Sequence, residues 1–177
     1  IVQRPLEWGA DISIHSATKY IDGQGRTLGG IILSSNSIIE KIKAFARHTG
    51  PALSPFNAWI LSKSLETLEV RMEKHCSNAC EIAKRLEGHT ALEWVKYPLL
   101  KSHPQHEIAI KQMNFGGGIV SFALKGGLEA GRKFLDRLEL FSLTANLGDT
   151  RSIATHPAST THSKLTPEQR AEVGIGE

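Results

Sequence analysis

The pattern of hydrophobic and polar residues predicts strands interleaved with helices. Apolar and polar residues alternate over 10–15, which is typical of a strand, and residues 28–33 form a compact apolar run typical of a buried strand. The polar, glycine-containing residues 16–27 between them predict a loop. Further strands are expected over residues 92–97, 119–124 and 140–144.

Apolar residues spaced by threes and fours predict one long amphipathic helix in the middle of the chain. It runs from about Pro55 to about Glu87, roughly 50 Å at 1.5 Å per residue. A helix this long commonly bridges two parts of a protein. We therefore expect a boundary near residue 88, with one domain over residues 1–87 and a second over residues 88–177.

Capping residues predict where other helices begin. Ser37 and Glu40 have the spacing of a capping box, so a helix is expected to open at Ser37. Thr166 and Gln169 have the same spacing and predict a short last helix. Two more helices are expected over residues 105–113 and 128–138. This interleaving of strands and helices predicts an α/β or α+β fold class.

Composition and charge narrow the class of protein. Hydrophobic residues make up 40% of the 177 residues and charged residues 22%, which is ordinary for a folded protein and excludes disorder of the whole chain. The net charge of +3 is small and scattered, so neither nucleic acid nor a membrane is an expected partner. The longest apolar runs are too short for a transmembrane span, and no signal peptide is recognisable.

Cysteines and histidines suggest no special chemistry. Two thiols, Cys76 and Cys80, fit a reducing, cytoplasmic setting, and Cys76 lies on the apolar stripe of the long helix, where a packed thiol is expected. The histidines lack the convergent ligands of a zinc site, so no metal is expected. Because the chain starts at Ile1 rather than Met, we expect it to be a piece of a longer protein.

The most informative residues are a lysine and two hydroxyl residues after the first predicted strand: Ser16, Thr18 and Lys19. In an extended backbone both hydroxyls project to one side, where they can bind a phosphate while Lys19 reaches a carbonyl of the same molecule. Pyridoxal 5'-phosphate (PLP) carries that pair of groups, an aldehyde and a phosphate. The spacing alone also fits a surface loop in which all three side chains are solvated.

A longer run, residues 9–30, resembles the lysine region of the Cys/Met-metabolism family of PLP-dependent enzymes (the trans-sulfuration enzymes). Later segments resemble that family in the same order: 50–59, 65–68, 102–106, 146–149 and 156–162. The resemblance implies a partial α/β, fold-type I (aminotransferase-like) architecture. Residues 1–87 match the end of the large PLP-binding domain with its bridging helix, and residues 88–177 match most of the small C-terminal domain.

The resemblance also implies roles for individual residues. Lys19 matches the family's catalytic Schiff-base lysine, Ser16 and Thr18 its phosphate-binding hydroxyls, and Asn146 the position whose backbone lies beside the substrate's α-carboxylate. Other parts of the family's site, including residues from a neighbouring subunit and the arginine that grips the carboxylate, have no counterpart in this sequence. We therefore expect little activity from this chain alone, and a homodimer or homotetramer when it is complete.

Two features indicate a branch of the family. Residues 22–26 and 102–106 look closest to the O-succinylhomoserine sulfhydrylase branch. Ala145 and Asn146 stand where relatives that form or cleave cystathionine usually carry Glu-Ser, which favours sulfide over an amino acid as nucleophile. The expected reaction joins O-succinylhomoserine or O-acetylhomoserine to sulfide and gives homocysteine. Cystathionine γ-synthase activity, methionine γ-lyase activity and a non-catalytic remnant that acts through subunit association remain alternatives.

Overall fold

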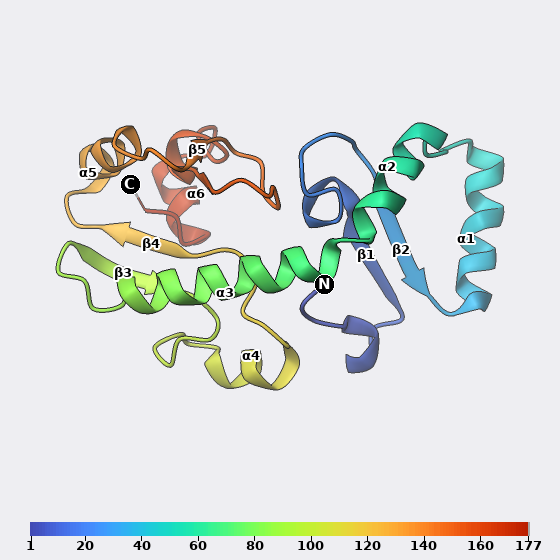
Figure 1. Cartoon of the computed structure of the whole chain (residues 1–177), viewed down its shortest axis with the longest axis horizontal. Coiled ribbons are helices and arrows are strands. Elements are labelled where there is room, and N and C mark those ends of the chain that lie inside the picture. The colour runs from blue at the N-terminus through green and yellow to red at the C-terminus, as the bar shows by residue number, and fades with distance from the viewer. Residues whose placement is uncertain (177) are drawn as a thin grey trace.

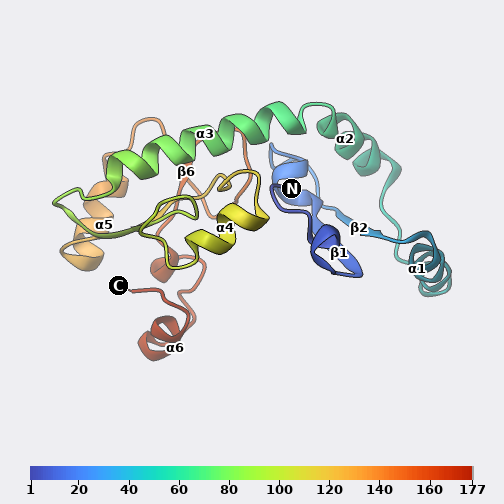
Figure 2. The same cartoon turned by 90° about the horizontal axis from the view of Figure 1, so that it is seen from below.

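The computed structural model describes residues 1–176 as two groups of elements joined by a helix (Figure 1). The chain order is η1 (Pro5–Trp8), β1 (Ile12–Ser16), η2 (Ala17–Ile21), β2 (Gly30–Ser34), α1 (Asn36–Thr49), α2 (Pro55–Leu65), α3 (Leu68–Leu86), β3 (Leu92–Lys96), α4 (His106–Gln112), β4 (Ser121–Leu124), α5 (Gly127–Asp136), β5 (Ser142–Leu143), β6 (Ile153–Ala154), η3 (Pro157–Ser159) and α6 (Pro167–Glu172). Helix α3 lies along one edge of the molecule, and β1, β2 and α4 lie on the same side of it (Figure 2).

The described strands form two-stranded sheets. Strands β1 and β2 pair antiparallel with Ile14 opposite Ile32, and β3 pairs antiparallel with β4. Strands β5 and β6 pair in parallel; β6 was not predicted, because two residues are too short to show a period. Strand β2 was predicted to be buried, but most of its residues are exposed. The reason is that the described residues do not cover the β1–β2 ribbon on both of its faces.

The predicted single helix from Pro55 to Glu87 is in fact two helices. Helix α2 ends at Leu65 and α3 begins at Leu68. At the break, the carbonyl of Ser64 accepts hydrogen bonds from Thr67 Oγ1 (3.3 Å) and Arg71 Nη2 (2.9 Å). These side chains replace regular helical bonding, and the backbone of Thr67 (φ −111°, ψ 3°) leaves the helix.

One predicted capping box is absent and the other is present. Helix α1 is capped by Ser35, whose carbonyl accepts hydrogen bonds from the amides of Ile38 (3.1 Å) and Ile39 (3.0 Å). Ser37 therefore lies inside the first turn, and its predicted capping box with Glu40 is wrong. At α6, Thr166 and Gln169 each bond the other's backbone amide, and that predicted box is confirmed. Sequence spacing alone did not distinguish the two cases.

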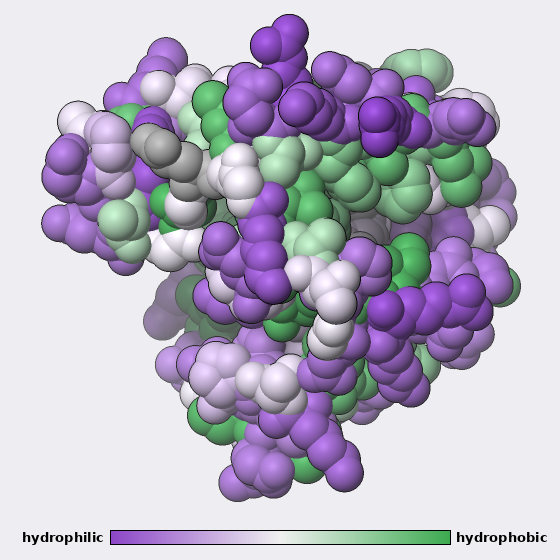
Figure 3. All heavy atoms as spheres, turned by 90° about the vertical axis from the view of Figure 1, so that its left-hand side faces the viewer, coloured by the Kyte–Doolittle hydropathy of each residue, from purple (hydrophilic) through white to green (hydrophobic). Residues whose placement is uncertain are grey.

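Little of the chain is deeply buried. Two small clusters form the core, one around Ala17, Ile21 and Leu61, the other around Ala83 and Tyr97. The accessible surface of 12211 Å² exceeds the roughly 8,500 Å² expected for a folded monomer of 19.4 kDa. Figure 3 shows hydrophobic side chains as a broken band among hydrophilic ones on one face. The structure is therefore open, with much apolar surface in contact with solvent.

Two further observations concern this fold. Cys76 is 2% exposed and unpaired, which confirms the predicted packed thiol on α3. None of the helices over residues 1–176 is both long and apolar enough to cross a bilayer.

Candidate active site

The predicted lysine lies in an unusual turn. Strand β1 ends at Ser16, and residues Ala17–Ile21 wind into a single π-helical turn, closed by bonds from Asp22 N to Ala17 O and from Gly23 N to Lys19 O. The loop predicted over residues 16–27 is therefore helical in its first part. Lys19 itself has φ −90° and ψ −123°, a sparsely populated conformation. Single π-helical turns occur frequently at functional sites.

The two hydroxyls before the lysine do not have equivalent surroundings. Thr18 Oγ1 accepts a hydrogen bond from Gly29 N (3.1 Å) and donates to Gly29 O (3.4 Å), which ties the turn to the start of β2. Ser16 is exposed and lines a cavity. The extended backbone on which the phosphate hypothesis was based stops at Ser16, so a shared orientation of the two hydroxyls is not a consequence of strand geometry.

The cavity has a volume of about 690 Å³. Ser16 and Lys19 line one side, and residues 116–118 and Lys96 lie on its wall. Its size is within the range of about 300–1,000 Å³ typical of cofactor and small-molecule sites. Its ionisable side chains among the described residues are lysines, histidines and a tyrosine, and no carboxylate lines it. Such a lining favours a ligand that carries negative charge.

A guanidinium group from α3 holds the backbone just after the lysine. Arg71 Nη1 donates to Tyr20 O (2.7 Å), and Nη2 donates to Ile21 O (3.1 Å) as well as to the carbonyl at the helix break. Burial lowers the pKa of Arg71, which nevertheless remains a cation. Gly23 lies so close to this guanidinium that a side chain there would collide with it. Sequence analysis missed Arg71, because an arginine on a polar helix face carries no signal.

A buried carboxylate organises the segment that follows. Asp22 has a side chain that is fully buried, and it accepts hydrogen bonds from Arg26 N (2.7 Å), Arg26 Nε (3.1 Å) and Gln24 N (3.3 Å). Arg26 Nη2 also donates to Ser64 Oγ (2.7 Å) on α2. The residues after the lysine turn are thus attached to the helices by charged hydrogen bonds from both Arg26 and Arg71.

The loop that contains Asn146 reaches the lysine turn. Gly148 is buried with φ +87°, and a Cβ built on it would lie 2.7 Å from the carbonyl carbon of Lys19. Thr150 N donates to Gly23 O (2.8 Å) in the same region. The side chain of Asn146 lies by Gly25, with Nδ2 3.3 Å from where a Cβ would stand. The structure therefore brings the Asn146 loop to the lysine, although the Asn146 side chain is not among the groups that line the cavity.

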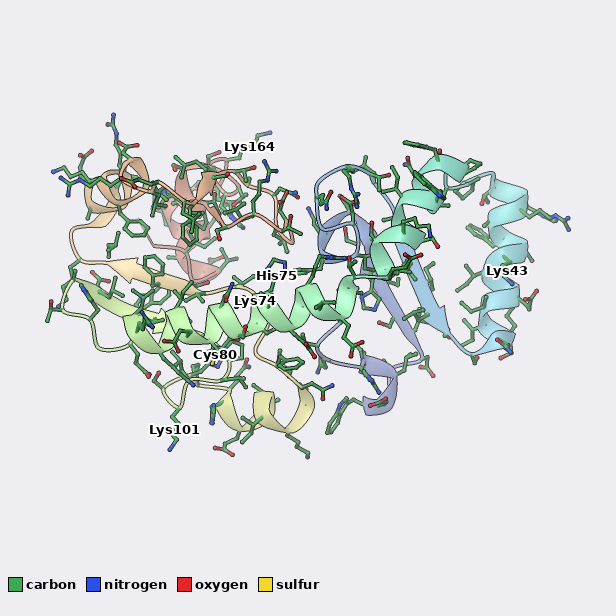
Figure 4. The ribbon with its side chains drawn as sticks, in the orientation of Figure 1. Lys43, Lys74, His75, Cys80, Lys101 and Lys164 are labelled. Atoms are coloured by element: carbon green, nitrogen blue, oxygen red, sulfur yellow. The ribbon has the colours of Figure 1, made fainter. Side chains whose placement is uncertain are left out.

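An aromatic pair lies between the two groups of elements. The rings of Tyr20 and His75 meet edge to face at 5.7 Å, and Figure 4 shows His75 rising from α3 at the middle of the molecule, whereas Lys101 and Lys164 point outward. Burial lowers the pKa of His75 and raises that of Tyr20. The cation of Arg71 lowers the pKa of His75 further, and Asp149 opposes that effect. His75 is therefore a neutral ring at neutral pH.

Comparison with known proteins identifies the family. The model of the family described as "Cys/Met metabolism PLP-dependent enzyme" matches residues 1–177. The chain belongs to this family. The predicted family, its PLP-dependent enzyme class and the partial fold-type I architecture are confirmed.

Individual relatives show how much of such a protein this chain represents. It is 49% identical to O-succinylhomoserine sulfhydrylase of Pseudomonas aeruginosa over 99% of the chain and 44% of the relative. It is 46% identical to L-methionine gamma-lyase of Pseudomonas deceptionensis over 99% of the chain and 45% of that relative. A crystal structure of cystathionine gamma synthase from Xanthomonas oryzae pv. oryzae, in complex with aminoacrylate and cysteine, superposes with a TM-score of 0.92 and 39% identity, covering 98% of this chain and 45% of that one. The chain thus spans under half the length of these relatives.

The residues present fit the cofactor that the family implies. Lys19 supplies an amine at the wall of the cavity, and Ser16 supplies an exposed hydroxyl beside it. The basic lining suits a phosphate. Thr18 contributes through its bonds to Gly29, which fix the turn that carries Lys19.

Proposed function

We propose that this chain is the lysine-bearing part of a PLP-dependent enzyme that joins an O-acylhomoserine to sulfide and gives homocysteine. In this reaction the bond from Cγ to the acyl oxygen breaks, a bond from Cγ to sulfur forms, and succinate or acetate leaves. The observation that carries the proposal is the placement of Lys19 in a π-helical turn on the wall of a basic cavity, in a chain that matches the family throughout.

Each site residue has a defined task in this proposal. The amine of Lys19 would hold the cofactor at its aldehyde carbon and would move protons at the substrate's Cα and Cβ. Ser16 holds the phosphate from the cavity wall, and Thr18, the second predicted phosphate-binding residue, contributes through its bonds to Gly29, so that the aldehyde stays aligned with Lys19. Asn146 presents its backbone to the substrate's α-carboxylate. When bound, PLP would delocalise the electron pair that remains on carbon after a proton is removed.

Two other reactions have support among the relatives. L-methionine gamma-lyases are 46% and 47% identical to this chain, and a cystathionine gamma synthase is 39% identical. The pair Ala145-Asn146 favours sulfide, because it lacks the Glu that cystathionine-forming and cystathionine-cleaving relatives usually carry. The 49% identity to a sulfhydrylase supports the same choice.

The organisation of the complete enzyme belongs to the same proposal. Residues 1–87 end a large cofactor-binding domain, residues 88–177 form most of a small domain, and α3 bridges the two. The enzyme is a homodimer or homotetramer that acts on small molecules in the cytoplasm, where the free thiols Cys76 and Cys80 remain reduced. Light scattering of the complete encoded polypeptide tests the assembly, and a monomer that retains full turnover would contradict it.

Turnover assays separate the candidate reactions. The complete encoded polypeptide, loaded with PLP, is supplied with O-succinylhomoserine and sulfide, with O-succinylhomoserine and cysteine, and with methionine alone. We expect the first pair to give the highest kcat/KM. Dominant cleavage of methionine, or faster reaction with cysteine than with sulfide, would overturn the sulfhydrylase proposal. Lys19→Ala should abolish all three activities, whereas Lys164→Ala, which changes an exposed lysine, should retain them.

A further inference from the structure

The lysine turn has a cation attached to its backbone on the side of α3. Arg71 uses both terminal nitrogens of its guanidinium on the two carbonyls that follow Lys19, those of Tyr20 and Ile21, at 2.7 and 3.1 Å. Its remaining nitrogen, Nε, donates to Thr67 Oγ1 at 3.1 Å. Every nitrogen of the guanidinium therefore donates a hydrogen bond, which holds this planar, forked group in one orientation.

This arrangement acts on the lysine through the backbone. The π-helical turn leaves Lys19 at φ −90° and ψ −123°, outside regular helical geometry. Arg71 fixes the two peptides that follow Tyr20 and Ile21, and Gly148 packs against the Lys19–Tyr20 peptide itself. Loss of the fork frees two carbonyls, so the turn can relax toward ordinary helical geometry and swing the Lys19 side chain.

We propose that Arg71 is a positioning residue that aims the amine of Lys19 at its electrophile. The inference rests on the proposed role of Lys19 and adds a residue to it. Because displacement of a reacting group by about 1 Å costs on the order of 100-fold in rate, we expect a large effect from a residue that touches neither cofactor nor substrate. A charge effect alone would be preserved by lysine, whereas a fork that spans two carbonyls would not.

The test measures bond formation separately from cofactor binding. PLP is added to the cofactor-free form of the complete encoded polypeptide. Stopped flow then follows the rate at which the visible absorption band of lysine-bound PLP appears. We expect Arg71→Gln to slow this rate about 10- to 100-fold and Arg71→Lys to restore it only in part. The matched control is Arg85→Gln, an exposed arginine on the same helix that donates to Glu81 (2.7 Å); it should stay within about twofold of the unchanged protein.

A second measurement removes the lysine. In a Lys19→Ala background, PLP binds without a covalent bond, and we expect Arg71→Gln to change its dissociation constant less than about threefold. An equal loss of affinity in both backgrounds would overturn the proposal, because the effect would then not pass through Lys19. If Lys19→Ala itself keeps the visible band, the proposed function fails, whatever Arg71 does.

A milder variant covers the case in which Arg71→Gln does not fold. Thr67→Val removes the acceptor of Arg71 Nε, together with the bond from Thr67 Oγ1 to Ser64 O, and leaves the charge of Arg71 in place. We expect a smaller slowing, about threefold to tenfold, with an unchanged dissociation constant in the Lys19→Ala background. A folded Thr67→Val or Arg71→Gln protein that forms the bond at the original rate would contradict the positioning role.

Discussion

Gly148 lies against the peptide bond that joins Lys19 to Tyr20. A Cβ on Gly148 would stand 2.7 Å from the carbonyl carbon of Lys19 and 3.0 Å from Cα of Tyr20, where backbone atoms cannot yield. Its φ of +87° also disfavours any other residue. One glycine thus links the Asn146 loop to the lysine turn.

The first prediction concerns this contact. Gly148→Ala should lower the free energy of unfolding by about 2–4 kcal/mol, because left-handed backbone strain and overpacking add together. Gly9→Ala is the matched control: its φ is +91°, but nothing lies within 4 Å of the added carbon, so only the strain of about 1–2 kcal/mol applies. Urea unfolding of the complete encoded polypeptide measures both. Equal losses in the two variants would show that the contact costs nothing.

The second prediction concerns the buried carboxylate of Asp22. Asp22→Asn removes the negative charge that accepts three hydrogen bonds from Gln24 and Arg26. We expect the free energy of unfolding to fall by only about 2 kcal/mol, since Arg26 is partly solvated. Glu40→Gln breaks an exposed pair with Lys43 (3.0 Å) and should cost less than about 0.5 kcal/mol. Thermal unfolding of both variants compares the two pairs. A similar loss for each would contradict the importance given to burial.

The third prediction concerns pH. Burial lowers the pKa of His75 in the folded protein below its ordinary value of 6.5. Below pH 6.5 the histidine of the unfolded chain is therefore protonated more readily than that of the folded protein, which favours unfolding. The stability from the neutral ring is present above pH 6.5 and is lost as pH falls through the folded pKa. Arg71 adds to this effect and Asp149 opposes it.

Replacement of that histidine should therefore flatten the acid side of the stability curve. We expect His75→Gln to show a smaller fall in unfolding free energy between pH 7 and pH 5 than the unchanged protein. His48, an exposed histidine on α1, provides the control variant His48→Gln. The interpretation is wrong if His75→Gln and the unchanged protein lose stability in parallel over this range.

The fourth prediction concerns the chain alone. Residues 1–177 produced as an isolated polypeptide should show less than about 1% of the turnover of a complete family enzyme, because this chain spans under half the length of its relatives. The assay is homocysteine release from O-succinylhomoserine and sulfide. Full turnover by the isolated chain would show that it contains a whole site.

Much of this fold follows from local sequence patterns. Alternation predicted β1, capping-box spacing predicted the start of α6, and helical spacing predicted the buried thiol of Cys76. The break between α2 and α3 could not be predicted, because it depends on Arg71 reaching the carbonyl of Ser64, a contact between side chain and backbone that leaves the apolar period unchanged.

The candidate site was only partly predictable for the same reason. Lys19 and its hydroxyl neighbours are adjacent in sequence, so their pattern was visible. The π-helical turn, the fork of Arg71 and the approach of Gly148 arise from contacts between distant segments, and nothing in their local sequence marks them. Roles assigned to Ser16, Thr18 and Asn146 by resemblance stay predictions.

Chemical trapping tests the role of Lys19 most directly. The complete encoded polypeptide is incubated with PLP, reduced with borohydride, digested and analysed by peptide mass spectrometry. We predict a pyridoxyl phosphate group on the peptide that contains Lys19 and on no other lysine peptide, and its loss in Lys19→Ala. Labelling of a different lysine, or no stable label at all, would contradict the account.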